Sequence, residues 1–187
     1  MLIYLADLCY LHDWDNNQPL PLNVAYVASY LKKVNKDVQI EIFKDPKEIM
    51  QKIKDSPPDV LALSHYDWNI NLDLAVLKNT KKDHPETITV MGGPSFEPTN
   101  MEWQKEFFEK RPQLDVYITG EGEWSFSKLI ELLIQYKSPN KIPFEELPAS
   151  LYLYDKTKKE IINNFTNFVD RIDLSTVPSP YLSGMMD

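Results

Sequence analysis

The sequence predicts an α/β protein: a doubly wound sheet of five parallel strands, with a small β-hairpin appended at its C-terminal side. Short apolar runs, each the length of a buried strand, recur five times along the chain. Segments with helical spacing separate these runs, and the pattern changes only after Lys137. Strands that alternate with helices in this way form a parallel sheet with right-handed crossovers and helices on both faces.

The five strand-like runs are short and mostly apolar, which is typical of strands that are buried on both faces of a parallel sheet. The third run is the clearest, because Val60, Leu61, Ala62 and Leu63 follow one another without a polar residue. The predicted strands are Leu2 to Ala6, Val38 to Phe43, Asp59 to His65, Thr87 to Met91, and Leu114 to Ile118.

The segments between the runs repeat apolar residues at the spacing of one helix face. A second helix is expected to begin at Asp45-Pro46, with Asp45 as the N-cap and Glu48 three residues further on. The third helix is expected to end near His84-Pro85, and the fifth to have Ser125 as its cap. The predicted buried faces are Val24, Val27, Ala28 and Leu31; Ile70, Leu74 and Leu77; Trp103 and Phe107; and Phe126, Leu129, Ile130 and Leu133.

Three regions follow from this organisation. Residues 1–138 are expected to form the α/β domain, and residues 139–170 a linker with the hairpin, whose two strands flank Asp155 to Lys159. Residues 171–187 contain two prolines and no helical or strand period, so we expect an extended segment that leads into a further domain.

Composition excludes several classes of function. The net charge of −8 disfavours nucleic acid and anionic membranes as partners, because both require clustered Lys and Arg. The single cysteine, Cys9, cannot form an internal disulfide, and together with the lack of an apolar run of membrane-spanning length this predicts a cytoplasmic protein. The Rossmann fingerprint and the P-loop are both absent.

Four loops are expected at the carboxyl ends of the predicted strands, where ligands bind in open α/β sheets. Four of the five glycines of the chain, Gly92, Gly93, Gly120 and Gly122, fall in two of these loops. Glycine allows close approach of a ligand to the backbone. A second interpretation is that Gly92 and Gly93 only form a tight turn between a strand and a helix.

The order of several segments resembles the N-terminal half of cobalamin-dependent radical S-adenosylmethionine (SAM) enzymes. These segments are Pro21 to Leu31, Ser64 to Asn69, Gly92-Gly93-Pro94, Gly120 to Glu123, Asp173-Leu174 and Pro178 to Tyr181. The resemblance covers nearly the whole chain and implies a flavodoxin-like fold of the B12-binding type. It also implies a corrin that lies across the strand ends, with its nucleotide tail inserted beside the sheet.

The resemblance assigns roles to individual positions. Ser64 matches the hydroxyl residue that faces the nucleotide tail, and the glycine pair matches the position that leaves room for the tail. The loop from Gly120 to Glu123 matches the turn near the tail pocket. The expected cofactor-binding residues are Ser64, Tyr66, Gly92, Gly93, Pro94, Gly120, Glu121 and Gly122.

One departure from the family concerns the lower cobalt ligand. Many cobalamin-binding domains carry Asp-x-His-x-x-Gly after the first strand, and the sequence has no such motif. By loop spacing, Asn17, Pro19 and Leu22 stand in its place, and the neighbours of His12 do not fit. We therefore expect cobalamin to bind without a histidine ligand from the protein.

Several other residues permit further chemistry, but each also has a structural interpretation. His65 with Asp67 would permit a nucleophilic triad, but a hydrogen-bonded structural histidine is favoured. The run from His12 to Asp15 contains metal-binding residue types, but a solvated loop is favoured. Glu121 and Glu123 would permit acid–base catalysis, but bonds to backbone amides at a helix start are favoured. Four aromatic residues are expected either to cover a flat macrocycle or to pack in a core or subunit contact: Tyr10, Trp14, Tyr66 and Trp68.

The sequence thus predicts a cobalamin-binding module that presents the corrin to a radical SAM barrel in the same protein, for methyl transfer or related radical chemistry. SAM and a [4Fe–4S] cluster would bind only in that further domain, because one cysteine cannot hold a cluster. No catalytic residue is expected in the chain itself. Two alternatives stay open: a cofactor-free docking or substrate-positioning domain, and a stand-alone flavodoxin-like binding protein.

Overall fold

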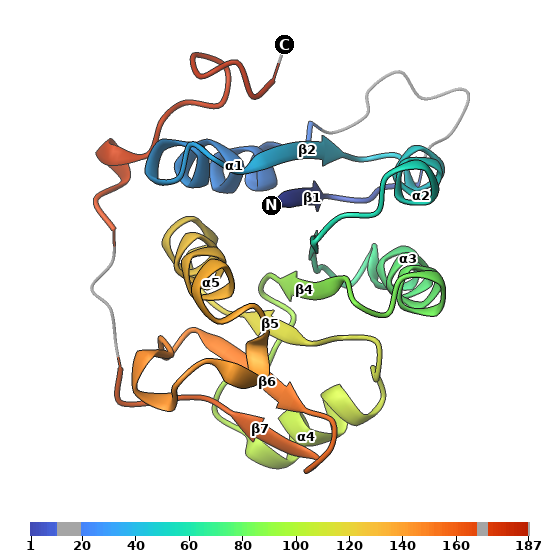
Figure 1. The fold of residues 1–187 in the computed structure, drawn as a ribbon, viewed down its shortest axis with the longest axis vertical. Helices are drawn as coiled ribbons and strands as arrows, with labels where there is room; N and C mark the ends of the chain where they lie inside the picture. The colour runs from blue at the N-terminus through green and yellow to red at the C-terminus, as the bar shows by residue number, and fades with distance from the viewer. Residues whose placement is uncertain (11–19, 168–171, 187) are drawn as a thin grey trace.

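The computed structural model describes residues 1–10, 20–167 and 172–186. Its centre is one continuous sheet with helices on both faces (Figure 1). The first five strands are parallel and confirm the predicted set. They are β1 (Leu2–Ala6), β2 (Gln39–Phe43), β3 (Val60–Ser64), β4 (Ile88–Gly92) and β5 (Val116–Ile118).

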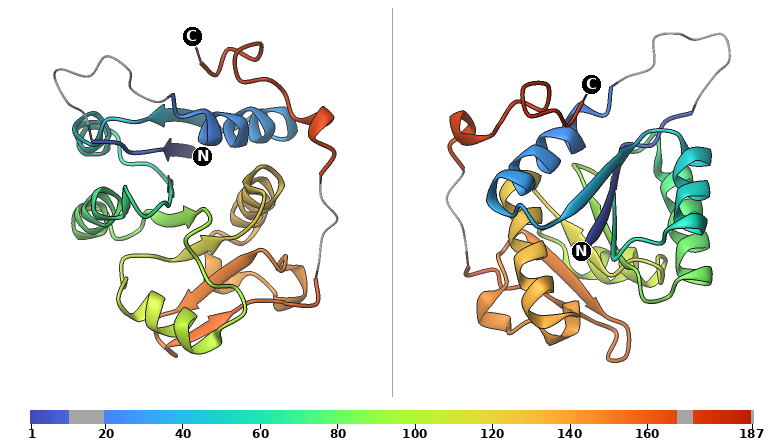
Figure 2. Two further views of the ribbon diagram at one scale, coloured as in Figure 1. Left: turned by 180° about the vertical axis from the view of Figure 1, so that it is seen from behind. Right: turned by 45° about the horizontal axis from the view of Figure 1, so that its top comes forward.

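The strand order is β2-β1-β3-β4-β5, so the direction of the chain across the sheet reverses between β1 and β3. Helices α1 (Leu22–Val34) and α5 (Gly122–Tyr136) lie side by side on one face. On the other face lie α2 (Pro46–Asp55), α3 (Ile70–Asp83) and α4 (Met101–Glu109), and the right-hand view of Figure 2 shows the sheet between the two layers. This is the predicted doubly wound, flavodoxin-like arrangement.

Alternating strand residues build two separate cores. Ile3 and Leu5 of β1 belong to the core under α1 and α5, whereas Tyr4 and Ala6 belong to the core under α2, α3 and α4. The side chains of β3 alternate in the same way, and all five of its residues are buried. An uninterrupted apolar run therefore marks this strand as buried on both faces.

The predicted hairpin forms, and it extends the main sheet. Strand β6 (Leu151–Asp155) pairs antiparallel with β5, and β7 (Glu160–Ile162) pairs antiparallel with β6, which gives seven strands within the described residues. Asp115, at the base of β5, accepts from Lys81 and Lys156 at 2.6 Å each. Burial works to raise the pKa of Asp115, but the two lysines hold it below its usual value. Short 3-10 turns at Pro139–Lys141 and Phe144–Glu146 connect α5 to the hairpin.

Two expectations for the helix starts had different outcomes. Asp45 caps α2 as predicted, because its carboxylate accepts from the backbone N–H of Lys47 at 2.7 Å. Ser125 is not the cap of α5, which begins three residues earlier with Glu121 at the N-cap position. The prediction that the Glu121 and Glu123 carboxylates bond backbone amides there is also wrong, because α5 has no side-chain capping hydrogen bond. The Ser125 hydroxyl instead lies 2.8 Å from that of Ser150.

The buried face of α3 differs from the prediction. Ile70 and Leu74 are only partly buried, whereas Asp73, Val76, Leu77 and Thr80 are fully buried. The Thr80 hydroxyl donates to the carbonyl of Val76 at 2.8 Å, which removes the cost of burying it. A helix period that counts only apolar residues misses such positions. In α4, Phe107 is buried as expected, but Trp103 is half-buried.

The C-terminal segment, residues 172–186, returns to α1 (Figure 1). It has one short turn, Leu174–Thr176, and the Thr176 carbonyl accepts from Lys33 at 2.6 Å. The Ser183 hydroxyl lies 3.0 Å from that of Ser29 in α1. Within the part of the chain that the structure describes, no helix is long and apolar enough to cross a bilayer.

Candidate functional site

A cavity of about 300 Å³ opens at the carboxyl ends of the parallel strands, between the sheet and the helices α1 and α5; we call it the strand-end cavity. It lies beside the reversal point between β1 and β3, where ligands of open α/β sheets bind. Its lining residues come from strands β1, β3, β4 and β5 (Leu5, Ala62, Leu63, Ser64, Val90, Gly92, Ile118), from α1 (Asn23, Val24, Tyr26, Val27), from α5 (Gly122, Glu123, Phe126), and from the loops (Tyr66, Gly93, Gly120, Glu121).

The structure brings seven of the eight predicted cofactor-binding residues together in this cavity. Ser64, Tyr66, Gly92, Gly93, Gly120, Glu121 and Gly122 all line it, although they come from three separate loops. Pro94 does not line the cavity, and its side chain is exposed. The residues from α1 were missed, because their apolar spacing indicated only a buried helix face.

Glycine occupies its positions in the cavity lining for different structural reasons. A Cβ on Gly93 would lie 2.2 Å from the carbonyl oxygen of His65, so a tight turn alone requires glycine there. Gly120 has a φ of +71°, which also favours glycine. A Cβ on Gly92 would meet the Ile118 carbonyl oxygen at 3.3 Å, and one on Gly122 would meet Val27 at 3.2 Å. Gly92 and Gly122 therefore allow close packing against Ile118 and Val27, two other residues of the cavity lining.

A chain of polar groups crosses the base and the mouth of the cavity. Ser64 lies at the end of β3, and its hydroxyl donates a short hydrogen bond to the carboxylate of Asp7, the first residue after β1. Asn23 lies near Asp7, and its Nδ2 donates to the Tyr66 hydroxyl at 3.4 Å. Burial raises the pKa of Asp7, and the Ser64 and Asn23 side chains oppose this rise. Sequence reasoning missed Asp7 and Asn23, since neither stands in a recognisable motif.

His65 points to the other face of the sheet and has a structural role, as favoured from the sequence. Its Nδ1 lies 3.0 Å from the Tyr117 hydroxyl, which donates to the carbonyl of Gly93 at 3.1 Å. Burial, with a smaller effect of Arg111, lowers the pKa of His65 to about 4, so the ring is neutral at pH 7.

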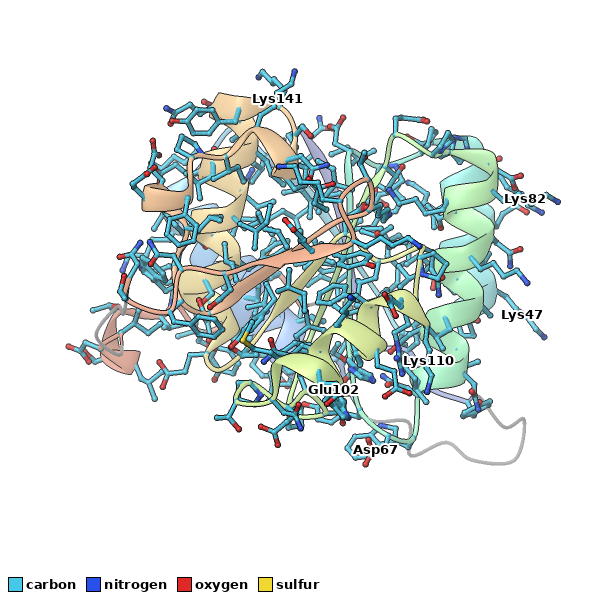
Figure 3. All side chains as sticks on the ribbon, turned by 90° about the horizontal axis from the view of Figure 1, so that it is seen from below. Lys47, Asp67, Lys82, Glu102, Lys110 and Lys141 are labelled. Atoms are coloured by element: carbon cyan, nitrogen blue, oxygen red, sulfur yellow. The ribbon has the colours of Figure 1, made fainter. Side chains whose placement is uncertain are left out.

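The triad interpretation is wrong. Ser64 bonds Asp7, His65 bonds Tyr117, and Asp67 accepts from Ser95 at 2.8 Å, so the three side chains have separate partners. Asp67 is exposed at the edge of the molecule (Figure 3).

An aromatic pair stands at the mouth of the cavity. The rings of Tyr66 and Trp68 stack with their centroids 4.3 Å apart and their planes at 9°. Tyr66 lines the cavity, and Trp68 is 67% exposed, so the pair is not part of a core. Tyr10 is also exposed, and Trp14 lies outside the described residues.

Neither histidine that the structure describes belongs to the cavity lining: His65 is on the opposite face of the sheet, and His84 caps the C-terminal end of α3. The described residues contain no cluster of three metal-binding side chains. His12 with its neighbours to Asp15, and Asn17 to Pro19, lie outside the described residues, and Leu22 begins α1.

A second buried carboxyl group, Asp73 in α3, lies close enough to Asp7 for their charges to interact. Its side chain is fully buried, and neither oxygen has a hydrogen-bond partner among the described residues. Burial, and to a smaller extent the charge of Asp7, raises the pKa of Asp73 to about 8. The group is therefore mostly protonated at neutral pH.

Three comparisons place this geometry among known proteins. Residues 16–130 match the family described as the B12 binding domain. The 2-(S-pantetheinyl)-carbapenam-3-carboxylate methyltransferase of Streptantibioticus cattleyicolor is 29% identical over 174 residues, which are 90% of this chain and 24% of that protein. The cobalamin-dependent radical SAM methyltransferase TokK of Streptomyces tokunonensis is 29% identical over 176 residues, with the same coverage.

A solved structure has the same fold along almost the entire chain. It is the cobalamin-dependent S-adenosylmethionine radical enzyme OxsB with aqua-cobalamin bound, with a TM-score of 0.69, 20% identity, and coverage of 98% of this chain and 24% of that one. This chain thus spans about a quarter of the length of each of these relatives.

Proposed function

Because the chain belongs to the B12-binding domain family, we propose that it binds cobalamin, with the nucleotide tail in the strand-end cavity and the corrin across the mouth. The observation that carries this proposal is that the space beside Ser64 and Gly92 is open. A chain that had kept the fold but lost the cofactor would be expected to fill this space with its own side chains.

The residues present fit such a tail. A volume of about 300 Å³ is at the lower end of ligand pockets, which suits the tail of the cofactor but leaves the corrin outside. The floor is apolar, from Leu5, Ala62 and Val90, with the hydroxyl of Ser64 among them. The cofactor itself would supply the cobalt chemistry, and the residues of the chain would bind and orient it.

The aromatic pair supports a position for the corrin at the mouth. Tyr66 lines the cavity and stacks on the exposed Trp68, so one flat apolar surface stands where a macrocycle would lie. We propose that this pair covers the face of the corrin that points towards the protein, without a histidine ligand on cobalt.

The proposal for the whole protein is that this module presents cobalamin to a radical SAM barrel in the same chain, for methyl transfer or related radical chemistry. The relatives named above are radical SAM or methyltransferase proteins about four times as long. SAM and the [4Fe–4S] cluster would belong to the barrel, and residues 171–187 would lead into it.

A cofactor-free docking domain would need no open cavity. The first test is to mix the protein with hydroxocobalamin, separate free corrin by gel filtration and record the absorption spectrum. We expect corrin to co-elute with the protein in about equal amounts. Protein free of corrin at high micromolar concentration, in several preparations, would favour the cofactor-free alternative.

The expected absence of a histidine ligand on cobalt is tested with a variant of His12. His12→Ala is expected to leave the cobalt absorption spectrum of the bound cofactor unchanged, because the protein supplies no histidine ligand. A shift of that spectrum in the variant would show that His12 coordinates cobalt.

Trp68→Ala is expected to weaken hydroxocobalamin binding about three- to tenfold, the usual effect of removing one stacked aromatic contact. A titration followed by the quenching of protein fluorescence measures the affinity. Leu182→Ala removes another exposed apolar side chain, outside the cavity, and serves as the control. Equal affinities for the Trp68 variant and the parent would remove the aromatic pair from the corrin site.

A further inference from the structure

Asp7 does not line the strand-end cavity, but it determines how Ser64 can bond a ligand there. The two residues follow the paired positions Ala6 and Leu63 of neighbouring strands, so they lie side by side at the point where β1 and β3 end. The Ser64 hydroxyl donates its hydrogen bond to the Asp7 carboxylate.

A serine hydroxyl has one proton and two lone pairs. Because Asp7 takes the proton, the oxygen of Ser64 that lines the cavity has only lone pairs to offer. A hydrogen bond to a carboxylate is also stronger than one to a neutral acceptor. A ligand group with only lone pairs, such as a ring nitrogen, would therefore have to compete with Asp7 for the proton.

Asn23 orients the hydroxyl of Tyr66, the second polar side chain that lines the cavity near Ser64. Its amide oxygen accepts from the backbone N–H of Val24 at 2.7 Å, and its Nδ2 donates to the Tyr66 hydroxyl at 3.4 Å. Tyr66 accepts in this contact and keeps its own proton for a ligand.

We propose that Asp7 is a positioning residue that makes Ser64 a hydrogen-bond acceptor, so that the tail of the cofactor meets Ser64 with an O–H or N–H donor. This inference rests on the proposed cobalamin function. The donor would be a hydroxyl of the tail's ribose or the amide N–H that joins the tail to the corrin, rather than the ring nitrogen of the base.

The experiment is a double-mutant cycle on the full chain, with Ser64→Ala, Asp7→Asn and the double variant. Ser64→Ala removes the acceptor. Asp7→Asn replaces a carboxylate that only accepts by an amide that can also donate, so the proton of Ser64 is no longer held in one direction. Each single variant is expected to weaken hydroxocobalamin binding about three- to tenfold, and the double variant no more than Ser64→Ala alone.

Dicyanocobinamide has neither ribose nor base and ends in an aminopropanol arm with an amide N–H and a hydroxyl, so it separates the ribose from the linker next to the corrin. An effect of Ser64→Ala on both corrins assigns the donor to the linker next to the corrin, and an effect on hydroxocobalamin alone assigns the ribose hydroxyl; either result supports the proposal. Ser127→Ala, another buried serine of this half of the molecule but not of the cavity lining, is the control and should leave both affinities unchanged. Circular dichroism checks that each variant is folded.

Three results would overturn the inference. Tighter hydroxocobalamin binding in Asp7→Asn would mean that Ser64 donates to the base. Additive losses in the double variant would mean that Asp7 acts independently of Ser64, as a structural residue. Unchanged affinities in Ser64→Ala would remove Ser64 from the ligand contact. If the parent protein binds neither corrin, it is the proposed function itself that fails.

Discussion

Val27→Trp is expected to lower the affinity for hydroxocobalamin at least about a hundredfold, which corresponds to ~2.7 kcal/mol. Val27 is a partly exposed residue of α1 that lines the strand-end cavity opposite Gly122. An indole ring at this position would occupy much of a space of about 300 Å³ and so exclude the tail. Gel filtration with hydroxocobalamin, followed by a titration, measures the loss.

The control uses the same substitution on the same helix. Val34 is the last residue of α1, is 54% exposed and does not line the cavity, so Val34→Trp should bind like the parent. Position 27 tests the cavity more directly than Gly92 does. A side chain at position 92 would first press against the Ile118 carbonyl of β5, so a loss of binding could reflect a disturbed sheet. Normal binding by a folded Val27→Trp variant would place the tail elsewhere.

Asp73→Leu is expected to stabilise the protein by several kcal/mol at pH 8 and much less at pH 5. In the unfolded chain a carboxyl group loses its proton near pH 4, whereas Asp73 keeps it in the folded protein up to about pH 8. The contribution of Asp73 to the stability is therefore highest below about pH 4. It falls as the pH rises from about 4 to about 8, by up to about 1.4 kcal/mol for each pH unit. Leucine has no proton to lose and needs no hydrogen-bond partner.

Thermal unfolding at pH 5 and pH 8 measures this difference. Asp83→Leu replaces an exposed carboxylate at the end of the same helix and should not change the dependence on pH. If Asp73→Leu were less stable than the parent at both pH values, Asp73 would have to be an ionised group with a bonded partner. In that case its role would be to hold the strand ends together beside Asp7.

The sequence was sufficient for the architecture. All five parallel strands were predicted because runs such as Val60 to Leu63 are apolar on both faces, which leaves few alternatives to a central strand. The cap of α2 was also predictable, because Asp45 and Pro46 act on their own backbone. Such features depend on neighbours in the sequence, so reading along the chain recovers them.

The polar groups behind the cavity could not be predicted in the same way. Asp7 obtains its role from Ser64, 57 positions further along the chain, and Asn23 obtains its role from both Asp7 and Tyr66. Asp73 contradicts the apolar period of α3, and only the fold shows that it is buried. The glycine loops were found because four glycines of five are concentrated there, but Gly93 is required by the turn alone.

The hairpin also determines where the module can be cut. A fragment that stops at Lys137 would lose the bonds from Thr119 to the Ser150 carbonyl and from Tyr154 to the Asp115 carbonyl, so the edge of β5 that faces β6 would be left unpaired. It would also uncover Phe96, which contacts Tyr152 of β6. A bare strand edge next to exposed aromatic rings invites aggregation, so an expression fragment that remains soluble needs the chain through β7.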